Sequence, residues 1–161
     1  MSYKPSYTVA EAQKKLEHYC AYQERCHLEV QTRLKTLGMI PRAQEEIIAY
    51  LVENNYLNES RFAQSFARGK FRLKKWGKER IVRELKLRQI SPYNIKLGLK
   101  EIEPDIYLDT LHELAAKFWK HHTHQTPIIR KKKVHDALKY RGWETQLIWA
   151  CIEDLEKNTN P

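Results

Sequence analysis

The chain has 161 residues, of which 42% are hydrophobic and 30% are charged, and its formal net charge is +9. The apolar fraction is enough for a buried core, and the low content of Gly (5) and Pro (6) excludes a disordered or collagen-like chain. No apolar run approaches the roughly 18 residues that a membrane span needs, and the polar N-terminus lacks the apolar core of a signal peptide. We therefore expect a cytoplasmic protein that needs no membrane.

Nearly all of the excess positive charge lies in the middle third of the chain. Residues 1–57 carry seven basic and seven acidic side chains, and residues 104–161 carry nine and eight. Residues 58–103, in contrast, carry thirteen basic and five acidic side chains. A positive field concentrated in this way suits a polyanion or an acidic protein surface.

Apolar residues recur at helical spacing along the whole chain, and no convincing strand pattern is present. Gly38 is a plausible end of one helix, and Pro41 fits the first turn of the next. Asn58 is expected to cap the helix that follows it. Ser91-Pro92 and Thr126-Pro127 each place a capping residue before a proline, which predicts two further helix starts.

The sequence also repeats itself at offsets of 51 and then 53 residues. These offsets align apolar positions in three copies, and Gly38 and Gly142 also coincide, whereas the middle copy has Gln89. The aligned columns are Leu34, Leu85 and Leu138; Val30, Ile81 and Val134; Met39, Ile90 and Trp143; Ile48, Leu99 and Ile152; and Leu51, Ile102 and Leu155. The pattern predicts an all-α fold, a tandem array of three three-helix repeats at residues 8–57, 58–103 and 104–157.

The middle repeat is predicted to present a basic face. At 100° per residue its first helix places Phe62, Phe66, Gly69 and Leu73 on the core side, and Arg61, Arg68, Arg72 and Lys75 in a separate stripe. The second helix directs Arg80, Arg83 and Lys86 away from its apolar positions, beside an exposed Leu87. A further basic cluster spans Arg130–Lys133. The candidate binding residues are Arg61, Arg68, Arg72, Lys75, Lys78, Arg80, Arg83, Lys86 and Lys132.

The partner of this face stays open at this point. Arginine pairs bidentately with phosphate and with carboxylate, so either nucleic acid or an acidic protein groove fits. Phe71 and Trp76 stand among the basic residues and offer rings for stacking on a base or for filling a partner's pocket. The alternative is a solvated surface whose charge serves only solubility.

The sequence offers no catalytic or metal-binding motif. The three histidines at His121, His122 and His124 fit an exposed loop better than a metal site. The cysteines are Cys20, Cys26 and Cys151; they lack the spacing of a zinc motif, and buried thiols are expected. No phosphate-cradling glycine loop, nucleophile elbow or HExxH sequence is present. We therefore expect a protein that is not an enzyme and that needs no cofactor and no metal.

The middle of the chain resembles the signature of the RecX family, which are bacterial regulators of the RecA recombinase. The resemblance extends into the first copy and, through Arg141-Gly142-Trp143, into the third. It departs at Asn58, where Asp is usual, at Cys26, and at Gln89, where a Gly is usual, which leaves open a different closure of that turn. The residues that carry it are Tyr56-Leu57-Asn58-Glu59-Ser60-Arg61-Phe62-Ala63, Phe66, Arg68, Gly77, Ile81, Glu84-Leu85-Lys86 and Ile90.

The resemblance implies an elongated, curved array of three-helix units that acts as a monomer in recombination, DNA repair and the SOS response. It implies binding to the groove of a RecA–DNA filament, with single- or double-stranded DNA as part of that partner, and inhibition of the recombinase. The basic face of the middle repeat is then the docking surface. The alternative is a stand-alone helical module that binds single- or double-stranded DNA directly.

Overall fold

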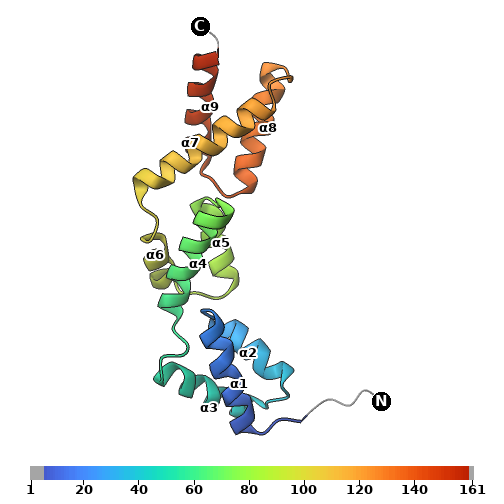
Figure 1. Ribbon diagram of the computed structural model, residues 1–161, viewed down its shortest axis with the longest axis vertical. Coiled ribbons are helices and arrows are strands. Elements are labelled where there is room, and N and C mark those ends of the chain that lie inside the picture. Colours follow the sequence, from blue (N-terminus) through green and yellow to red (C-terminus); the bar gives the residue numbers. More distant parts are fainter. Residues whose placement is uncertain (1–5, 160–161) are drawn as a thin grey trace, which may run out of the picture. The chain divides into compact units, whose positions relative to one another are not determined.

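The computed structural model describes residues 6–159, and all the regular structure in this range is helical (Figure 1). The all-α prediction is confirmed, and no helix among the described residues is both long and apolar enough to cross a membrane. Within the described range the helices are α1 (Val9–Tyr22), α2 (His27–Thr36), α3 (Pro41–Glu53), α4 (Glu59–Lys74), α5 (Lys78–Leu87), α6 (Pro92–Leu99), α7 (Pro104–His121), α8 (Pro127–Tyr140) and α9 (Thr145–Thr159).

The helix starts follow the capping signals. Asn58 accepts a hydrogen bond from the backbone N–H of Arg61 at 3.0 Å, and the Ser91 hydroxyl accepts one from Asn94 at 3.2 Å. At α1 the Thr8 and Glu11 side chains satisfy each other's backbone N–H groups in a capping box. Helices α3, α6, α7 and α8 each begin with a proline, which needs no hydrogen-bond acceptor at that position.

The chain forms two compact units. The first unit contains the described residues up to Ser65 together with Leu85–Leu97, and the second contains Phe66–Glu84 together with the residues from Gly98 onward. The middle repeat therefore contributes residues to both units. The repeat boundaries at 57/58 and 103/104 stay a prediction from the sequence.

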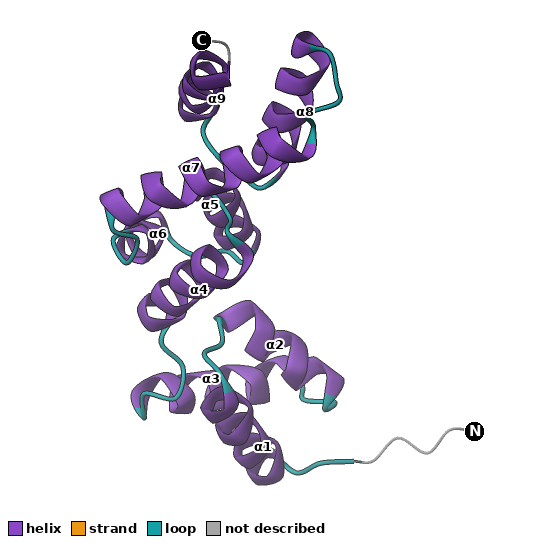
Figure 2. Ribbon diagram, turned by 45° about the horizontal axis from the view of Figure 1, so that its top comes forward, coloured by secondary structure: helices purple, strands orange, loops and turns teal. Residues whose placement is uncertain are grey.

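In the first unit, α1, α2 and α3 pack against one another (Figure 2). Their shared core contains Leu16, Leu34, Ile47 and Leu51, none of which has any exposed surface. In the second unit, α7, α8 and α9 pack against one another in the same way. Here the fully buried side chains include Leu111, Leu138 and Trp143.

The predicted repeat is visible in the helix boundaries. Helices α2, α5 and α8 end at Thr36, Leu87 and Tyr140, which are separated by the same 51 and 53 residues as the apolar columns. Leu34, Leu85 and Leu138 are each 0% exposed, as are Val30, Ile81 and Val134. The three middle helices thus bury the same two positions of the repeat.

The turn after each of these helices also closes in the same way. Gly38, Gln89 and Gly142 have φ values of +79°, +59° and +89°. The next residue's N–H then bonds back to the aligned leucine's carbonyl, at 3.0, 3.1 and 3.2 Å. Gln89 therefore adopts the left-handed conformation of the two glycines, and the missing glycine does not change the turn.

The predicted core face of α4 is wrong in part. Leu73 is 82% exposed, whereas Phe62, Ala63, Ala67 and Phe71 are buried. The helical projection favours the large apolar side chains, whereas the helix buries its small alanines at two of these positions. Phe71 is consequently a core residue that packs on Tyr107 and Trp143, and it is not available to a partner.

Candidate interaction surface

Residues 66–84 form the most basic part of the second unit, with eight Lys/Arg and two Asp/Glu. They comprise the second half of α4, the turn to α5 and most of α5. Arg72, Lys75 and Arg83 are exposed, and the structure gives them no ion pair with any described residue. These three predicted cations are therefore exposed and unpaired within this stretch of the second unit.

The turn between α4 and α5 is held against the turn between α8 and α9. The N–H groups of Gly77 and Glu79 donate to the carbonyls of Arg141 and Gly142 at 2.8 and 3.0 Å. In return, the indole N–H of Trp143 donates to the carbonyl of Lys75 at 3.1 Å. Backbone hydrogen bonds thus fix the start of α5 on the third repeat.

Tyr107 completes this junction from α7. Its hydroxyl accepts a hydrogen bond from the Lys78 N–H at 2.9 Å and donates one to the Glu144 carboxylate. Burial, followed by the bond to Glu144, raises the pKa of Tyr107 well above its usual range, so the ring stays neutral. The Lys78 ammonium lies 4.6 Å from the centre of the same ring, which places this predicted cation on an aromatic face.

Helix α5 also contacts α8 through Arg80. The Arg80 guanidinium lies 4.2 Å from the centre of the Trp76 ring and 4.9 Å from that of Tyr140, and it donates to the Tyr140 carbonyl at 3.3 Å. At the two preceding residues of these helices, Lys139 pairs with Glu79 at 2.8 Å. Two cations, one from each helix, therefore stand at this α5–α8 contact.

A shallow pocket lies at this contact. It is lined from α5 by Arg80, Arg83 and Glu84, and from α8 by Asp136, Lys139 and Tyr140. Asp136 holds the predicted Lys132 at 2.8 Å, and this ion pair lowers the pKa of the Asp136 carboxyl. The structure thus brings Arg80, Arg83 and, through Asp136, Lys132 together, although the sequence predicted them as separate basic clusters.

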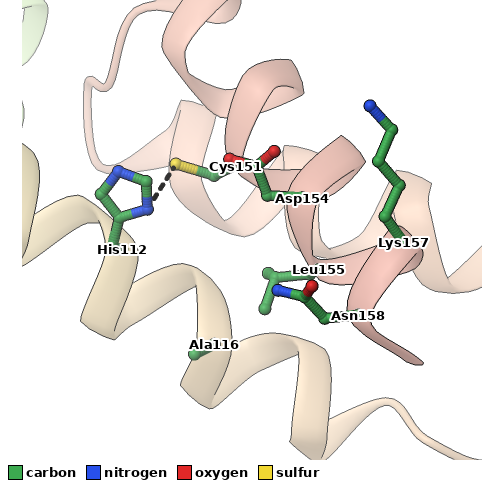
Figure 3. A pocket seen from close by; sticks show the side chains of 7 residues that line it. All are labelled: His112, Ala116, Cys151, Asp154, Leu155, Lys157 and Asn158. Carbon is green, nitrogen blue, oxygen red and sulfur yellow. Dashed lines mark hydrogen bonds between the residues drawn. The ribbon is translucent and has the colours of Figure 1, made fainter. Parts of the chain in front are cut away.

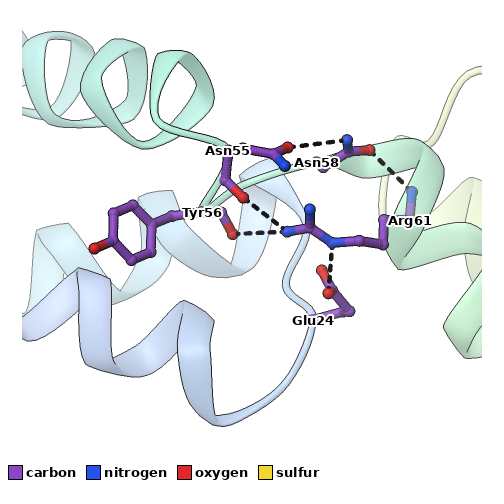
Figure 4. Close-up of polar contacts among 5 residues, drawn as sticks. All are labelled: Glu24, Asn55, Tyr56, Asn58 and Arg61. Atoms are coloured by element: carbon purple, nitrogen blue, oxygen red, sulfur yellow. Dashed lines mark hydrogen bonds and ion pairs between the residues drawn. The ribbon is translucent and has the colours of Figure 1, made fainter.

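Arg61 lies in the first unit and is committed to contacts within that unit (Figure 4). Its guanidinium pairs with Glu24 at 2.6 Å and donates to the carbonyls of Asn55 and Tyr56 at 2.9 and 3.4 Å. Arg61 therefore joins the α1–α2 loop and the α3–α4 turn to the start of α4. The sequence placed Arg61 in a stripe apart from the core, and the structure gives its guanidinium partners within the unit.

The remaining predicted residues differ in their ion pairing, in their backbone conformation and in the unit to which they belong. Arg68 pairs with Glu101 at 3.4 Å and is only partly exposed. Lys75 follows the end of α4 with a φ of +56°, so it does not belong to the helical stripe on which the sequence placed it. Lys86 is exposed but lies in the first unit.

Lys139 and Tyr140 are not among the residues predicted from the sequence. Tyr140 aligns with Leu87 of the middle repeat, since each is the last residue of its helix. Both side chains are largely exposed, Tyr140 at 71% and Leu87 at 66%. Because the sequence had already predicted an exposed Leu87, the repeat alignment carried the signal for an exposed aromatic ring at Tyr140.

A second pocket in the same unit contains a thiol and an imidazole (Figure 3). Sγ of Cys151 lies 3.6 Å from Nδ1 of His112, and Asp154 and Lys157 line the same pocket. Burial raises the pKa of Cys151, which keeps the thiol protonated and a poor nucleophile. Among the described residues, no three His, Cys, Asp or Glu side chains are grouped as metal ligands.

Two family models match the chain: "RecX, second three-helix domain" at residues 58–99 and "RecX, third three-helix domain" at residues 105–152. A curated "Regulatory protein RecX" of Lactobacillus gasseri is 29% identical over 146 residues, and that of Lactobacillus johnsonii is 26% identical over 142. These alignments cover 87% and 86% of this chain but only 52% and 51% of the relatives. The chain thus spans about half the length of the curated relatives it matches.

The solved structures show the same fold. The crystal structure of RecX from Lactobacillus salivarius superimposes with a TM-score of 0.80 at 21% identity, covering 92% of this chain and 96% of that one. A second structure, titled "Crystal structure of regulatory protein RecX", gives a TM-score of 0.77 at 22% identity, covering 91% of this chain and 73% of that one. The domain matches and this fold agree with the helical repeat array, and the chain belongs to the RecX family.

Proposed function

We propose that this chain is a nonenzymatic regulator that binds a RecA-type recombinase filament and inhibits the recombinase. The docking surface comprises the exposed cations of residues 66–84, with the α5–α8 pocket beside them. The curated relatives are named regulatory proteins, which supports a regulatory role over a catalytic one. The partner is the filament with its bound DNA, and the regulator acts from the cytoplasm as a monomer without a cofactor.

The observation that carries this proposal is that some arginines form ion pairs within the fold whereas others are exposed. Arg61 and Arg68 are engaged in ion pairs within their own units, whereas Arg72 and Arg83 are exposed on the second. A guanidinium that the fold does not use is available to a phosphate or a carboxylate of a partner. Backbone hydrogen bonds at the start of α5 hold this part of the chain in place before a partner arrives.

Reversal of these two charges tests the proposal. The Arg72→Glu/Arg83→Glu variant should fold normally, because exposed substitutions usually change stability by less than about 0.5 kcal/mol each. It should lose filament binding and inhibition of strand exchange, since repulsion replaces attraction at both contacts. Binding is measured by fluorescence anisotropy on a RecA filament, on naked single strands and on duplex DNA.

The matched control is Lys14→Glu/Lys35→Glu, which changes the net charge equally at two exposed lysines of the first unit. This control should inhibit strand exchange as the wild type does. Equal inhibition by both variants would reduce the basic surface to a solvated one. Strong binding to naked DNA without any effect on filaments would favour the second candidate, a stand-alone DNA-binding module.

A further inference from the structure

We propose that Tyr140 is a stacking platform for one unpaired nucleobase, with Arg83 and Lys139 placed to meet the phosphates on either side of it. The inference deepens the proposed function, because it names single-stranded nucleic acid as a partner of the same surface. It rests on that function only for the biological setting, and it is tested separately on naked strands.

Arg80 lies over the Tyr140 ring, and most of the Tyr140 side chain remains exposed. Arg80 lies over the ring at 4.9 Å and is tied to the backbone carbonyl of the same residue at 3.3 Å. Tyr140 nevertheless remains 71% exposed, although it stands at the end of α8 beside a packed contact. A cation behind an aromatic ring orients it and leaves the opposite face free for another flat group.

Trp76, which the sequence singled out for stacking, is already occupied. Arg80 lies 4.2 Å from the centre of its indole ring, and Lys70 lies 5.1 Å from it. Trp76 also packs edge-on against Phe66 at 6.3 Å. The accessible ring of this surface is therefore Tyr140, and Trp76 serves to support Arg80.

The surroundings of Tyr140 are those of a phosphate-bearing ligand. Arg83 and Lys139 line the same pocket as the ring, and Arg83 has no ion pair with the residues that the structure describes. Lys139 is shared with Glu79, so it offers part of its charge to a second anion. A ring flanked by cations is the arrangement that binds a single strand, where every base has a face to stack and a phosphate on each side.

The same chemistry disfavours duplex DNA at this position. In a duplex both faces of each base are stacked on neighbours, so a base has to be unstacked before it reaches a protein ring. An unpaired strand presents its bases directly. We therefore expect the contribution of Tyr140 to be confined to single strands, while Arg83 contributes to both forms through charge.

The test measures anisotropy of a labelled oligothymidylate, an abasic strand of equal length and a duplex, using Tyr140→Ala and Tyr140→Phe. Loss of the ring should weaken oligothymidylate binding by about 5- to 150-fold and leave abasic-strand and duplex binding within about twofold. Tyr140→Phe, which keeps the ring, should bind as the wild type does. The control Tyr93→Ala removes a ring of equal exposure, 70%, from α6 and should change nothing.

A photocrosslinking arm does not depend on any variant. A strand carrying 5-iododeoxyuridine should crosslink to the peptide that contains Tyr140, as identified by mass spectrometry of the wild-type protein. The inference is overturned if Tyr140→Ala binds oligothymidylate as tightly as the wild type, if its loss is equal on the abasic strand, or if the crosslink maps elsewhere.

The outcomes separate this inference from the proposed function. If Tyr140→Ala loses oligothymidylate binding while Arg72→Glu/Arg83→Glu still inhibits on filaments, the stacking platform stands and the filament-docking surface is wrong. If the charge reversal abolishes filament inhibition and Tyr140→Ala binds every strand normally, the docking surface stands and the stacking platform is wrong.

Discussion

At the residue scale, Gln89 adopts a backbone conformation for which the two other repeats use a glycine. Its φ of +59° matches those of Gly38 and Gly142, and the same backbone hydrogen bond closes all three turns. A side chain in the left-handed region is strained, because Cβ approaches the following carbonyl. The fold therefore tolerates about 1 kcal/mol of strain at this position.

Replacement of this residue should reveal the strain. Gln89→Gly should stabilise the protein by about 0.5–1 kcal/mol, since relief of strain exceeds the added freedom of the unfolded chain. The reciprocal change, Gly38→Gln, should destabilise it by about 1 kcal/mol, although nothing lies within 4 Å of the new Cβ. Urea unfolding of both variants measures the two shifts, and shifts of the same sign would contradict the shared turn.

At the element scale, the start of α5 depends on two glycines that allow close backbone contact. A Cβ on Gly77 would lie 2.4 Å from the carbonyl oxygen of Gly142, and a Cβ on Gly142 would lie 2.2 Å from the Cβ atom of Arg80. Both approaches are shorter than atoms tolerate, so the two turns meet only because neither residue has a side chain. This contact positions Arg80 for Tyr140.

Gly77→Ala should separate the two turns. We expect a loss of about 2–4 kcal/mol in unfolding free energy, because backbone hydrogen bonds from Gly77 and Glu79 cannot form around the added methyl group. The control Gly69→Ala lies within α4, where nothing is within 4 Å of the new Cβ, and should stabilise by about 0.5–1 kcal/mol. Equal unfolding midpoints for the two variants would show that the turns are not in close contact.

The sequence predicted the elements better than it predicted their faces. Local capping signals predicted the helix starts at Asn58, Ser91 and Thr126. Periodic apolar spacing predicted the burial of Leu34, Leu85 and Leu138. Both kinds of signal act within one or two helical turns. Local signals did not predict the inward face of α4 or the ion pair of Arg61. Both depend on neighbours far along the chain, such as Glu24, which no local pattern reports.

The candidate surface shows the same division. Its charge was evident from composition, but its geometry comes from α8, whose contacts with α5 join residues 60 positions apart, as in the pair of Glu79 and Lys139. The repeat alignment came nearest to this result, because it placed Tyr140 at the aligned position of an exposed Leu87. Only the fold shows that Arg80 lies against that ring.

At the scale of the whole molecule, the net positive charge is confined to residues 66–97. Residues 1–65 carry eight basic and eight acidic side chains and residues 98–161 carry ten of each, so neither segment has a net charge. Residues 66–84 carry a net +6 and residues 85–97 a net +3. A field of this kind attracts a polyanion at low salt and weakens as salt screens it.

The salt dependence of binding should therefore identify what the basic surface meets. Each exposed arginine that contacts a phosphate should contribute about 0.7 to the slope of log affinity against log salt on single strands, and about 0.9 on duplex DNA. Arg72→Ala and Arg83→Ala should each flatten the slope by that amount, whereas Arg61→Ala should leave it unchanged, because its guanidinium already pairs with Glu24. Arg61→Ala should instead lower the unfolding free energy by about 1–3 kcal/mol.

If Arg72 and Arg83 meet acidic residues of the recombinase, their alanine variants will bind naked DNA with an unchanged slope and lose affinity only for the filament. A slope that falls with Arg61→Ala as much as with Arg83→Ala would show that Arg61 leaves its ion pair to reach DNA, and the division between structural and binding arginines would be wrong.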